Sequence, residues 1–304
     1  MVLAVGGAWC QTLTTKELPT QLIRPGDQYY ENVRSIVDWS PEELIKALPE
    51  LRGLKPPQAQ DDLALILRKV GENVGAFFRD FPNTTSTEQI RQQRLDADGH
   101  VTDTVTEKFY YLALAQRESG NLSLQEYRTN AKGKRIEPSD MEQGSAITRG
   151  FASMSIHFHP SYQSGSTFRF LGRQVIHGRQ TYVLAFAQSP TAARALTRVD
   201  LPEKSALVLS QGVAWVDADS YQIIRMRVDL LAPRRDIGLE RQTTEILFDR
   251  VRFKRTPLVL WLPRQVTVNQ RRKGQAFRNR HRYSRFRLFT VEADSERKAV
   301  LPNP

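Results

Sequence analysis

The sequence is short of the residues and motifs that mark several common protein classes. Cys10 is the only cysteine among 304 residues, so no intramolecular disulfide can form. Apolar residues never continue for the roughly 18 positions that a membrane-spanning helix needs. The glycine-rich loops that bind phosphates and dinucleotides are missing, and so is the G-x-S-x-G frame of many serine hydrolases. These absences disfavour a disulfide-stabilised scaffold, a helical membrane protein and a nucleotide-dependent enzyme.

Charge is abundant but unevenly distributed along the chain. Apolar residues make up 40% and charged residues 25% of the sequence, which are ordinary values for a folded globular protein. Residues 1–150 hold 18 Lys and Arg against 21 Asp and Glu, a net charge of −3. Because the whole chain carries +11, residues 151–304 carry +14. We therefore expect the C-terminal half to face an anionic partner or membrane.

The first ten residues are small and apolar, and they carry no charged side chain. They are similar to the end of a secretory signal peptide with a cleavage site near Ala8, although the basic region that normally precedes it is missing. We expect an exported protein whose true start lies upstream of Met1; the alternative is a short apolar N-terminus without a targeting role. Trp9 is not the small residue that a lipidation signal places before cysteine, so a lipid on Cys10 is disfavoured.

Two helices are predicted before residue 83. Ser40, Pro41 and Glu43 carry the pattern of a capping box with proline in the first turn, which predicts a helix from residue 40 to about residue 51. A second helix is predicted over residues 61–81, where apolar residues recur at helical spacing on one face. Residues 1–39 are expected to hold a signal remnant and an irregular lead-in, and residues 40–82 the N-terminal helices.

Residues 83–292 are predicted to form an antiparallel sheet. Alternating apolar and polar residues are separated by turn signals such as Asp98-Gly99 and His177-Gly178, and few helices intervene. Residues 130–165 are expected to form a long connection with a short helix, and residues 293–304 a tail. The predicted fold class is α+β: a curved antiparallel sheet, or half-barrel, wrapped on the long amphipathic helix.

The segment from Arg250 to Val291 contains 13 Lys and Arg and no acidic residue. In an extended strand Arg278, Arg280 and Arg282 would share one face, and Asn279, His281 and Tyr283 the other. A cationic edge that discourages strand pairing, an anionic lipid or glycan surface and a nucleic acid that stacks on the interleaved aromatics remain open as explanations. The cations that we expect to face an anionic surface are Arg271, Arg272, Lys273, Arg278, Arg280 and Arg282.

Motifs for catalysis or metal binding are weak. His157 and His159 would share a face in an extended segment, a spacing that metal sites use, but no third ligand is evident. Ser145, Ser153 and Ser155 precede this pair without the frame of a nucleophile. We therefore expect no catalytic residue, no metal and no cofactor, and an envelope hydrolase without a recognisable motif is the least favoured alternative.

Two short strings carry a resemblance to a known family. Gly212-Val213-Ala214-Trp215-Val216-Asp217, followed by Tyr221-Gln222-Ile223-Ile224-Arg225, resembles a recurrent hairpin of the outer-membrane lipoprotein-sorting superfamily, the LolA/LolB/RseB-like half-barrels. Trp261-Leu262-Pro263 before Val266-Thr267-Val268 is similar to the penultimate hairpin of the same group. The resemblance covers roughly residues 60–292. It implies an 11-stranded half-barrel whose concave apolar face accepts acyl chains without chemistry.

These observations lead to an expected function of binding rather than catalysis. We expect a periplasmic or envelope protein that holds a hydrophobic or lipid-bearing ligand in the concavity of the half-barrel. A basic nucleic-acid-binding protein that uses residues 271–287 is the main alternative. The residues that we expect to line or floor the concavity, or else to form ordinary core, are Phe168, Phe170, Tyr182, Leu184, Trp215 and Trp261.

Overall fold

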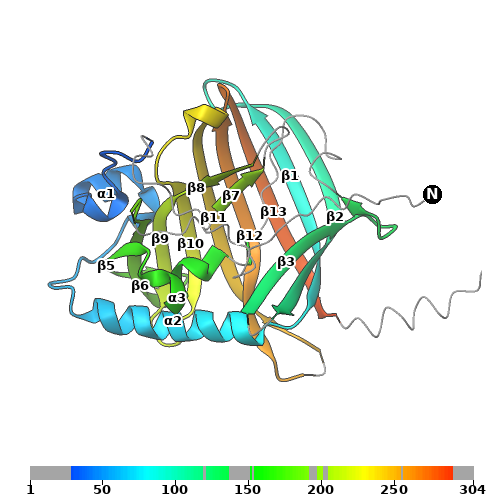
Figure 1. Ribbon diagram of the computed structural model, residues 1–304, viewed down its shortest axis with the longest axis horizontal. Helices are drawn as coiled ribbons and strands as arrows, with labels where there is room; N and C mark the ends of the chain where they lie inside the picture. The colour runs from blue at the N-terminus through cyan, green and yellow to red at the C-terminus, as the bar shows by residue number, and fades with distance from the viewer. Residues whose placement is uncertain are drawn as a thin grey trace, which may run out of the picture.

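The computed structural model describes residues 29–118, 121–136, 151–152, 154–191, 197–200, 205–254 and 256–289. An antiparallel sheet of eleven strands dominates these residues and curves around one side of the molecule (Figure 1). Its strands, in spatial order, are β4 (Arg135–Ile136), β3 (Asn121–Thr129), β2 (Val101–Glu118), β1 (Thr84–Leu95), β13 (Gln275–Leu288), β12 (Val259–Arg272), β11 (Leu239–Arg252), β10 (Ile223–Leu230), β9 (Ser210–Asp217), β6 (Arg179–Gln188) and β5 (Ser166–Ile176). A separate pair joins β7 (Thr197–Asp200) and β8 (Ser205–Val208).

Tight turns set the register of the meander. His177 and Gly178 have φ values of 48° and 77°, and Lys273 and Gly274 have 48° and 76°. Two successive residues with positive φ are the requirement of a type I′ turn, whose twist matches that of two antiparallel strands. Glycine meets this requirement without a steric penalty. The hairpin predicted at His177-Gly178 is therefore confirmed, and a second of the same kind forms at Lys273-Gly274.

One pairing in the sheet joins segments that are far apart in the sequence. β1 pairs with β13, from Thr84 opposite Leu288 to Leu95 opposite Ala276. This contact makes a single sheet from the early hairpins and the late meander. The eleven-stranded antiparallel sheet that the family resemblance implies is confirmed.

Helices flank the sheet. α1 (Pro41–Ala47) begins with the predicted capping box: Ser40 Oγ accepts from the backbone N–H of Glu43, and the Glu43 carboxylate accepts from that of Ser40. α2 (Asp62–Asp80) is the predicted long helix and lies across the open side of the curve (Figure 1). It packs on β3, on β5 and on the short helices η4 (Met154–Phe158) and α3 (Pro160–Gln163). The expectation of a sheet wrapped on this helix stays a prediction.

The sheet has two faces, and each is covered differently. We call the face toward α2 the inner face; the buried helix residues Ile66, Val70, Val74 and Phe78 share one apolar cluster with it. We call the opposite face, which carries Trp215, the outer face. On β5, β6, β9 and β10 it packs against residues 29–54, which include α1 and the short helices η1 (Ile36–Asp38) and η2 (Pro49–Leu51).

An ionic contact fixes this N-terminal segment on the outer face. Arg227 on β10 forms an ion pair of 2.7 Å with Glu50 in η2 and another of 2.7 Å with Asp229 on its own strand. Residues 29–39, which were expected to be irregular, contribute Tyr30, Ile36 and Val37 to the same apolar cluster. Among the described residues, no helix has both the length and the apolar composition needed to cross a membrane.

The connection between the early and late strands holds more structure than expected. The short helix predicted in residues 130–165 is confirmed as η4 and α3, and a two-residue strand, β4, also lies there. Ser145 and the glycines at 144 and 150 lie outside the described residues. His281 lies in the middle of β13, in the extended conformation that the sequence predicts.

Candidate functional site

Four of the six residues expected in the concavity lie together on the inner face. Phe168 and Phe170 on β5 and Tyr182 and Leu184 on β6 all belong to the apolar cluster beneath α2. Phe170 and Leu184 are buried, whereas Phe168 and Tyr182 are partly exposed. The rings of Phe170 and Tyr182 lie 6.0 Å apart, and Tyr182 stacks on Tyr221 at 5.8 Å. A role for these four residues in ligand binding stays a prediction.

Trp215 and Trp261 lie on the outer face instead. Trp215 on β9 is fully buried under the N-terminal segment and donates from Nε1 to Gln174 Oε1 at 2.7 Å. Trp261 on β12 packs against the same cluster. The physical reason is strand alternation: Ala214 and Val216 point inward, so the residue between them must point outward. The expectation that these tryptophans line the concavity is therefore wrong.

The inner cluster is not sealed from solvent at one end of the sheet. Here the chain leaves α2 for β1, β11 turns into β12, and β13 ends. Figure 1 shows the β11–β12 hairpin reaching past the C-terminal end of α2. We call the five partly exposed apolar residues that these elements contribute the apolar rim: Phe77, Phe248, Leu258, Leu260 and Phe286.

A buried ionic network on the inner face joins side chains from β1, β3 and β13. Arg128 donates two hydrogen bonds to Glu88, from Nε at 2.6 Å and from the terminal nitrogen Nη2 at 2.9 Å. Tyr283 donates to the same carboxylate at 2.7 Å, and His281 Nδ1 lies 2.9 Å from it. All four residues are at most 4% exposed. Sequence analysis missed this network because its members are separated by up to 195 residues.

The network fixes the charge of each member. Burial raises the pKa of Glu88, but the charge of Arg128 and the hydrogen bonds from His281 and Arg128 outweigh it and lower the pKa to about 2. Burial lowers the pKa of His281, against the opposing effect of Glu88. A neutral His281 beside a carboxylate must donate from Nδ1, which makes Nε2 an acceptor. The buried Nε2 atom has no hydrogen-bond partner among the described residues. Phe151 packs on the imidazole at 5.0 Å.

The cations predicted to face an anionic surface do not act as one group. Arg278, Arg280 and Arg282 do share the outer face of β13, as the alternation predicts. Arg278 donates to Asn269 at 3.1 Å, whereas Arg280 and Arg282 are exposed. At the turn, Arg271 pairs with Glu240 at 3.0 Å, Arg272 is partly buried and Lys273 is exposed. An anionic-surface role for this set stays a prediction.

The same strand argues against base stacking by residues 271–287. Phe277 and Tyr283 are 8% and 4% exposed, and they point away from the arginine face. A site for single-stranded nucleic acid needs aromatic faces and cations on one surface. The interleaving in the sequence places these two kinds of side chain on opposite faces, so the nucleic-acid alternative loses its structural basis.

The histidine pair considered for metal binding is not extended. His157 lies in η4, is 1% exposed and packs on Phe186 at 5.0 Å, while His159 caps α3 through Nδ1. Burial lowers the pKa of His157 to about 4, so it is neutral at pH 7. Ser155 is buried in the same short helix, and Ser153 lies outside the described residues. The backbone conformation therefore removes the shared face on which the metal hypothesis rested.

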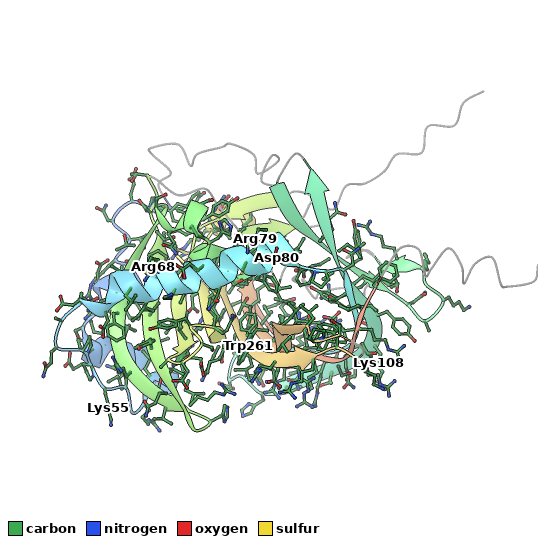
Figure 2. All side chains as sticks on the ribbon, turned by 90° about the horizontal axis from the view of Figure 1, so that it is seen from below. Lys55, Arg68, Arg79, Asp80, Lys108 and Trp261 are labelled. Carbon is green, nitrogen blue, oxygen red and sulfur yellow. The ribbon has the colours of Figure 1, made fainter. Side chains whose placement is uncertain are left out.

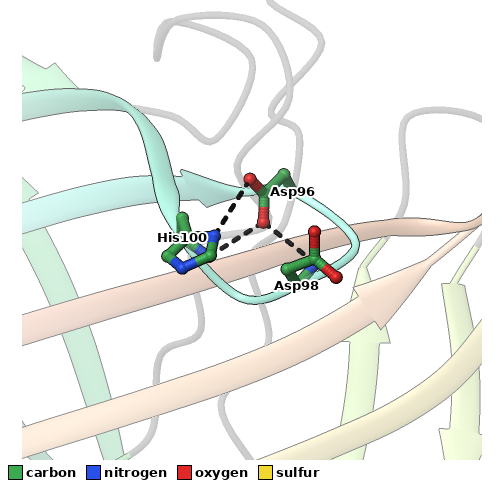
Figure 3. Close-up of side chains that lie close together, drawn as sticks. All are labelled: Asp96, Asp98 and His100. Atoms are coloured by element: carbon green, nitrogen blue, oxygen red, sulfur yellow. Dashed lines mark hydrogen bonds and ion pairs between the residues drawn. The ribbon is translucent and has the colours of Figure 1, made fainter.

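One acidic cluster does lie at metal-ligand spacing, in the β1–β2 turn. Asp96, Asp98 and His100 are exposed, and one ligand atom from each falls within 4.8 Å of the others (Figure 3). Asp96 Oδ1 already accepts from the backbone N–H groups of Asp98 and His100, at 3.0 and 2.8 Å. These bonds explain the cluster as a turn motif.

Known proteins resemble this chain in structure but not detectably in sequence. No family model matches it, and no curated protein does. A putative outer membrane lipoprotein-sorting protein domain from Vibrio parahaemolyticus is 12% identical, with a TM-score of 0.40 over 77% of this chain and 97% of that one. A DUF1329 family protein from Desulfovibrio piger is 13% identical, with a TM-score of 0.40 over 79% of this chain and 100% of that one. A LolA superfamily protein from Nitrosomonas europaea is 11% identical, with a TM-score of 0.37 over 75% of this chain and 96% of that one. These are likenesses of structure alone, at identities of 11–13%.

Proposed function

We propose that the chain is a non-catalytic envelope protein that binds a hydrophobic or acylated ligand between α2 and the inner face of its sheet. The observation that carries the proposal is the apolar rim, where the inner cluster reaches solvent beside the end of α2. Apolar side chains that are left partly exposed around a cluster are a common mark of a binding surface. The ligand would extend the cluster along the partly exposed residues Phe168 and Tyr182.

The proposal explains why the inner face is built as it is. α2 contacts the sheet at β3 and β5 and also packs on the short helices η4 and α3. Among the described residues its polar contacts to the rest of the chain are few: Gln163 Nε2 donates to the backbone O of Leu67 at 3.1 Å, Asn73 Nδ2 to the backbone O of Ser220 at 2.8 Å, and Arg173 pairs with Asp62 at 3.3 Å. A helix that is held mainly by apolar packing can shift to admit an acyl chain at a small cost in hydrogen bonding. The chain of residues from the rim to Phe168 then forms the path of the ligand.

The test is binding of a series of fluorescent fatty acids of increasing length. Each buried methylene contributes about 0.8 kcal/mol, so affinity should rise about fourfold per methylene until the path is full. The variant Leu67→Gln, at a partly buried position on the inner side of α2, should weaken binding of the long probes. Leu65→Gln is the matched control because Leu65 is 45% exposed on the same helix. An affinity that does not depend on chain length would exclude the proposal.

A further inference from the structure

A pocket opens on the outer face, and most of its lining lies on the side of the sheet away from α2. It has a volume of about 820 Å³ and is framed by β1, β2, β10–β13 and the β5–β6 turn. Pockets that hold small ligands commonly measure about 300–1,000 Å³. Trp261 and Lys108, both labelled in Figure 2, are part of its lining. Sequence patterns do not indicate this pocket because its walls come from six strands and the β5–β6 turn.

A continuous row of side chains forms the floor of the pocket. Arg225 lies opposite Leu247, Gln265 opposite both Leu247 and Arg282, and Gln89 opposite both Arg282 and Lys108. Residues directly opposite one another share a face of the sheet. This row is continuous with the fully buried Trp215, opposite Arg225, which confirms that it lies on the outer face.

The pocket has an excess of positive charge. Six cations line it, against the single carboxylate of Asp249. Three of them are neutralised: Arg179 by Asp217 at 3.0 Å, Arg225 by Glu245 at 3.1 Å and Arg264 by Asp249 at 3.8 Å. The remaining three, which have no carboxylate partner among the described residues, are Lys108, Arg282 and Arg285.

The backbone directs one of these cations by an unusual conformation. Arg285 has a φ of 56°, and the β1–β13 register shifts at the adjoining position, between Thr85 and Thr87. A positive φ is uncommon for residues other than glycine, and a bulge can re-aim a side chain. At this bulge Arg285 lines the pocket instead of following the alternation of β13. Arg225 adds a buried Nε that has no hydrogen-bond partner among the described residues.

The lining also includes apolar surface beside the cations. The guanidinium of Arg179 lies over the ring of Trp261, 5.7 Å from its centre. Ile176 and Ile224 also line the pocket. A pocket with three unpaired cations on one side and an indole on the other suits an anion attached to an apolar or ring-bearing group. Phosphate esters have this chemistry, because Arg and Lys bind their oxygens by charge-assisted hydrogen bonds.

We propose that this outer pocket binds a phosphate ester, with Lys108, Arg282 and Arg285 holding the phosphate and Trp261 packing against the remainder of the ligand. The proposal does not depend on the hydrophobic ligand of the inner face. Two sources share the chemistry: the headgroup of an anionic phospholipid in a membrane and a soluble phosphate ester. Of the six cations that the sequence offers for an anionic surface, only Arg282 lines this pocket.

The test compares two charge-matched triple variants of the full chain. The pocket variant is Lys108→Gln/Arg282→Gln/Arg285→Gln. The control is Arg91→Gln/Arg280→Gln/Arg287→Gln, which removes three exposed cations from β1 and β13 that do not line the pocket. Binding is measured to phosphatidylglycerol-containing vesicles, to vesicles of phosphatidylcholine alone, and to glycerol phosphate in solution. Thermal unfolding of both variants checks that the fold is retained.

The pocket variant should lose about a hundredfold in affinity for phosphatidylglycerol vesicles, because each Lys or Arg near an anionic bilayer contributes about a factor of five. The loss of vesicle affinity in the control variant should be at least ten times smaller than in the pocket variant. If the parent chain binds glycerol phosphate and the pocket variant does not, the ligand is a soluble ester. If the parent chain binds phosphatidylglycerol vesicles but not glycerol phosphate, the ligand is a phospholipid headgroup. Equal losses in the two variants, or no binding of the parent chain to any of the phosphate probes, would overturn the proposal.

Discussion

At the scale of single residues, the network around Glu88 joins four buried side chains. One carboxylate accepts from Arg128, Tyr283 and His281. Removing one partner of a buried ion pair leaves the other charge without compensation, which costs about 3–5 kcal/mol. Four side chains from three strands therefore depend on the charge of a single group.

The substitution Glu88→Gln should lower the free energy of unfolding by about 3–5 kcal/mol, because it leaves the guanidinium of Arg128 buried and unpaired. Glu245→Gln is the matched control, since its ion pair with Arg225 is 21–32% exposed. Pairs of that kind contribute about 0–1 kcal/mol. Urea unfolding followed by circular dichroism measures both values. Similar losses for the two variants would contradict the buried network.

His157 gives the fold a dependence on pH. Burial lowers its pKa to about 4, while an unfolded chain has a histidine pKa of 6.5. Above pH 6.5 the side chain is neutral in the folded and the unfolded state, so it adds nothing to the pH dependence of stability. As the pH falls below 6.5 the unfolded state takes up a proton that the folded state excludes until about pH 4, so stability decreases.

Replacing His157 with Gln should therefore reduce the loss of stability between pH 6.5 and 4 by the share of His157, while His159 and His281, whose pKa values burial also lowers, keep theirs. The parent chain should lose up to about 3 kcal/mol over this range from His157 alone, at about 1.4 kcal/mol per pKa unit. Glu88, whose pKa is 4.5 in the unfolded chain and about 2 in the fold, adds a loss only below about pH 4.5. Unfolding free energies measured at several pH values test the prediction. A variant profile parallel to that of the parent would refute it.

At the scale of elements, the helices illustrate what the sequence could predict. The capping box of α1 and the span of α2 follow from local patterns, and both are confirmed within a few residues. The buried positions of α2 are Ile66, Val70, Val74 and Phe78, whereas Leu67 and Phe77 lie at the edge of the cluster. Periodicity identifies the apolar face of a helix, but its depth of burial depends on what packs against it.

The strands show where local patterns fail. Alternation in β13 separates the arginines from Asn279, His281 and Tyr283, but it does not say which set is buried. The pairing of β1 with β13 decides that, and it joins residues almost 200 positions apart in the sequence. Register shifts add to the difficulty: the shift in the β5–β6 pairing between Phe170 and Gly172 interrupts the alternation. The prediction for Trp215 fails for a different reason. Apolar residues occupy both faces of β9, so the sequence does not indicate which face is the inner one.

The variant Ile66→Ala should destabilise the fold by about 2–5 kcal/mol, because Ile66 is 1% exposed in the interface between α2 and the sheet. Leu65→Ala, one position earlier on the exposed side, should change the unfolding free energy by less than about 0.5 kcal/mol. The comparison is made by denaturant unfolding. Near-neutral values for both variants would mean that α2 is peripheral to the core.

Gly212, the first residue of the hairpin that resembles the lipoprotein-sorting superfamily, has a steric role. A Cβ at this position would lie 1.9 Å from the backbone O of Arg227 and 3.0 Å from the ring of Phe186. The glycine therefore allows β9 and β10 to pair closely while an aromatic ring covers the strand.

The substitution Gly212→Ala should destabilise the chain by about 1–3 kcal/mol, the usual range for an overpacked core. Gly178→Ala is a useful comparison: it has open space around it, but its φ of 77° strains any residue with a Cβ. Because the nearest contact is the backbone O of Arg227, Phe186→Leu should leave most of the Gly212→Ala loss in place. Full recovery of stability by Phe186→Leu would show that the ring, and not the β10 backbone, sets the cost.

At the scale of the whole molecule, the sheet separates two proposed binding surfaces. The apolar rim and the cluster beneath α2 lie on the inner face, and the basic pocket lies on the outer face. Phe248 and Tyr283 are the exceptions, since both belong to the inner cluster and to the lining of the outer pocket. Phe248 lies next to a shift in the β11–β12 register, between Leu247 and Phe248. Tyr283 is buried in the network around Glu88, so Phe248 is the more accessible of the two candidates for coupling between the surfaces.

The two binding surfaces should respond independently to substitutions that do not involve Phe248 or Tyr283. The pocket variant should leave the affinity for a long fatty-acid probe unchanged, and Leu67→Gln should leave vesicle binding unchanged. In the combined variant the two losses should add within about 0.5 kcal/mol, because residues without shared contacts act independently. Phe248→Ala, by contrast, should weaken both fatty-acid binding and vesicle binding.

Any coupling between the two ligands must be reciprocal by linkage. The coupling is therefore measured as the fatty-acid affinity with and without glycerol phosphate. Coupling of more than about 1 kcal/mol that survives in Phe248→Ala would show that the sheet itself transmits it.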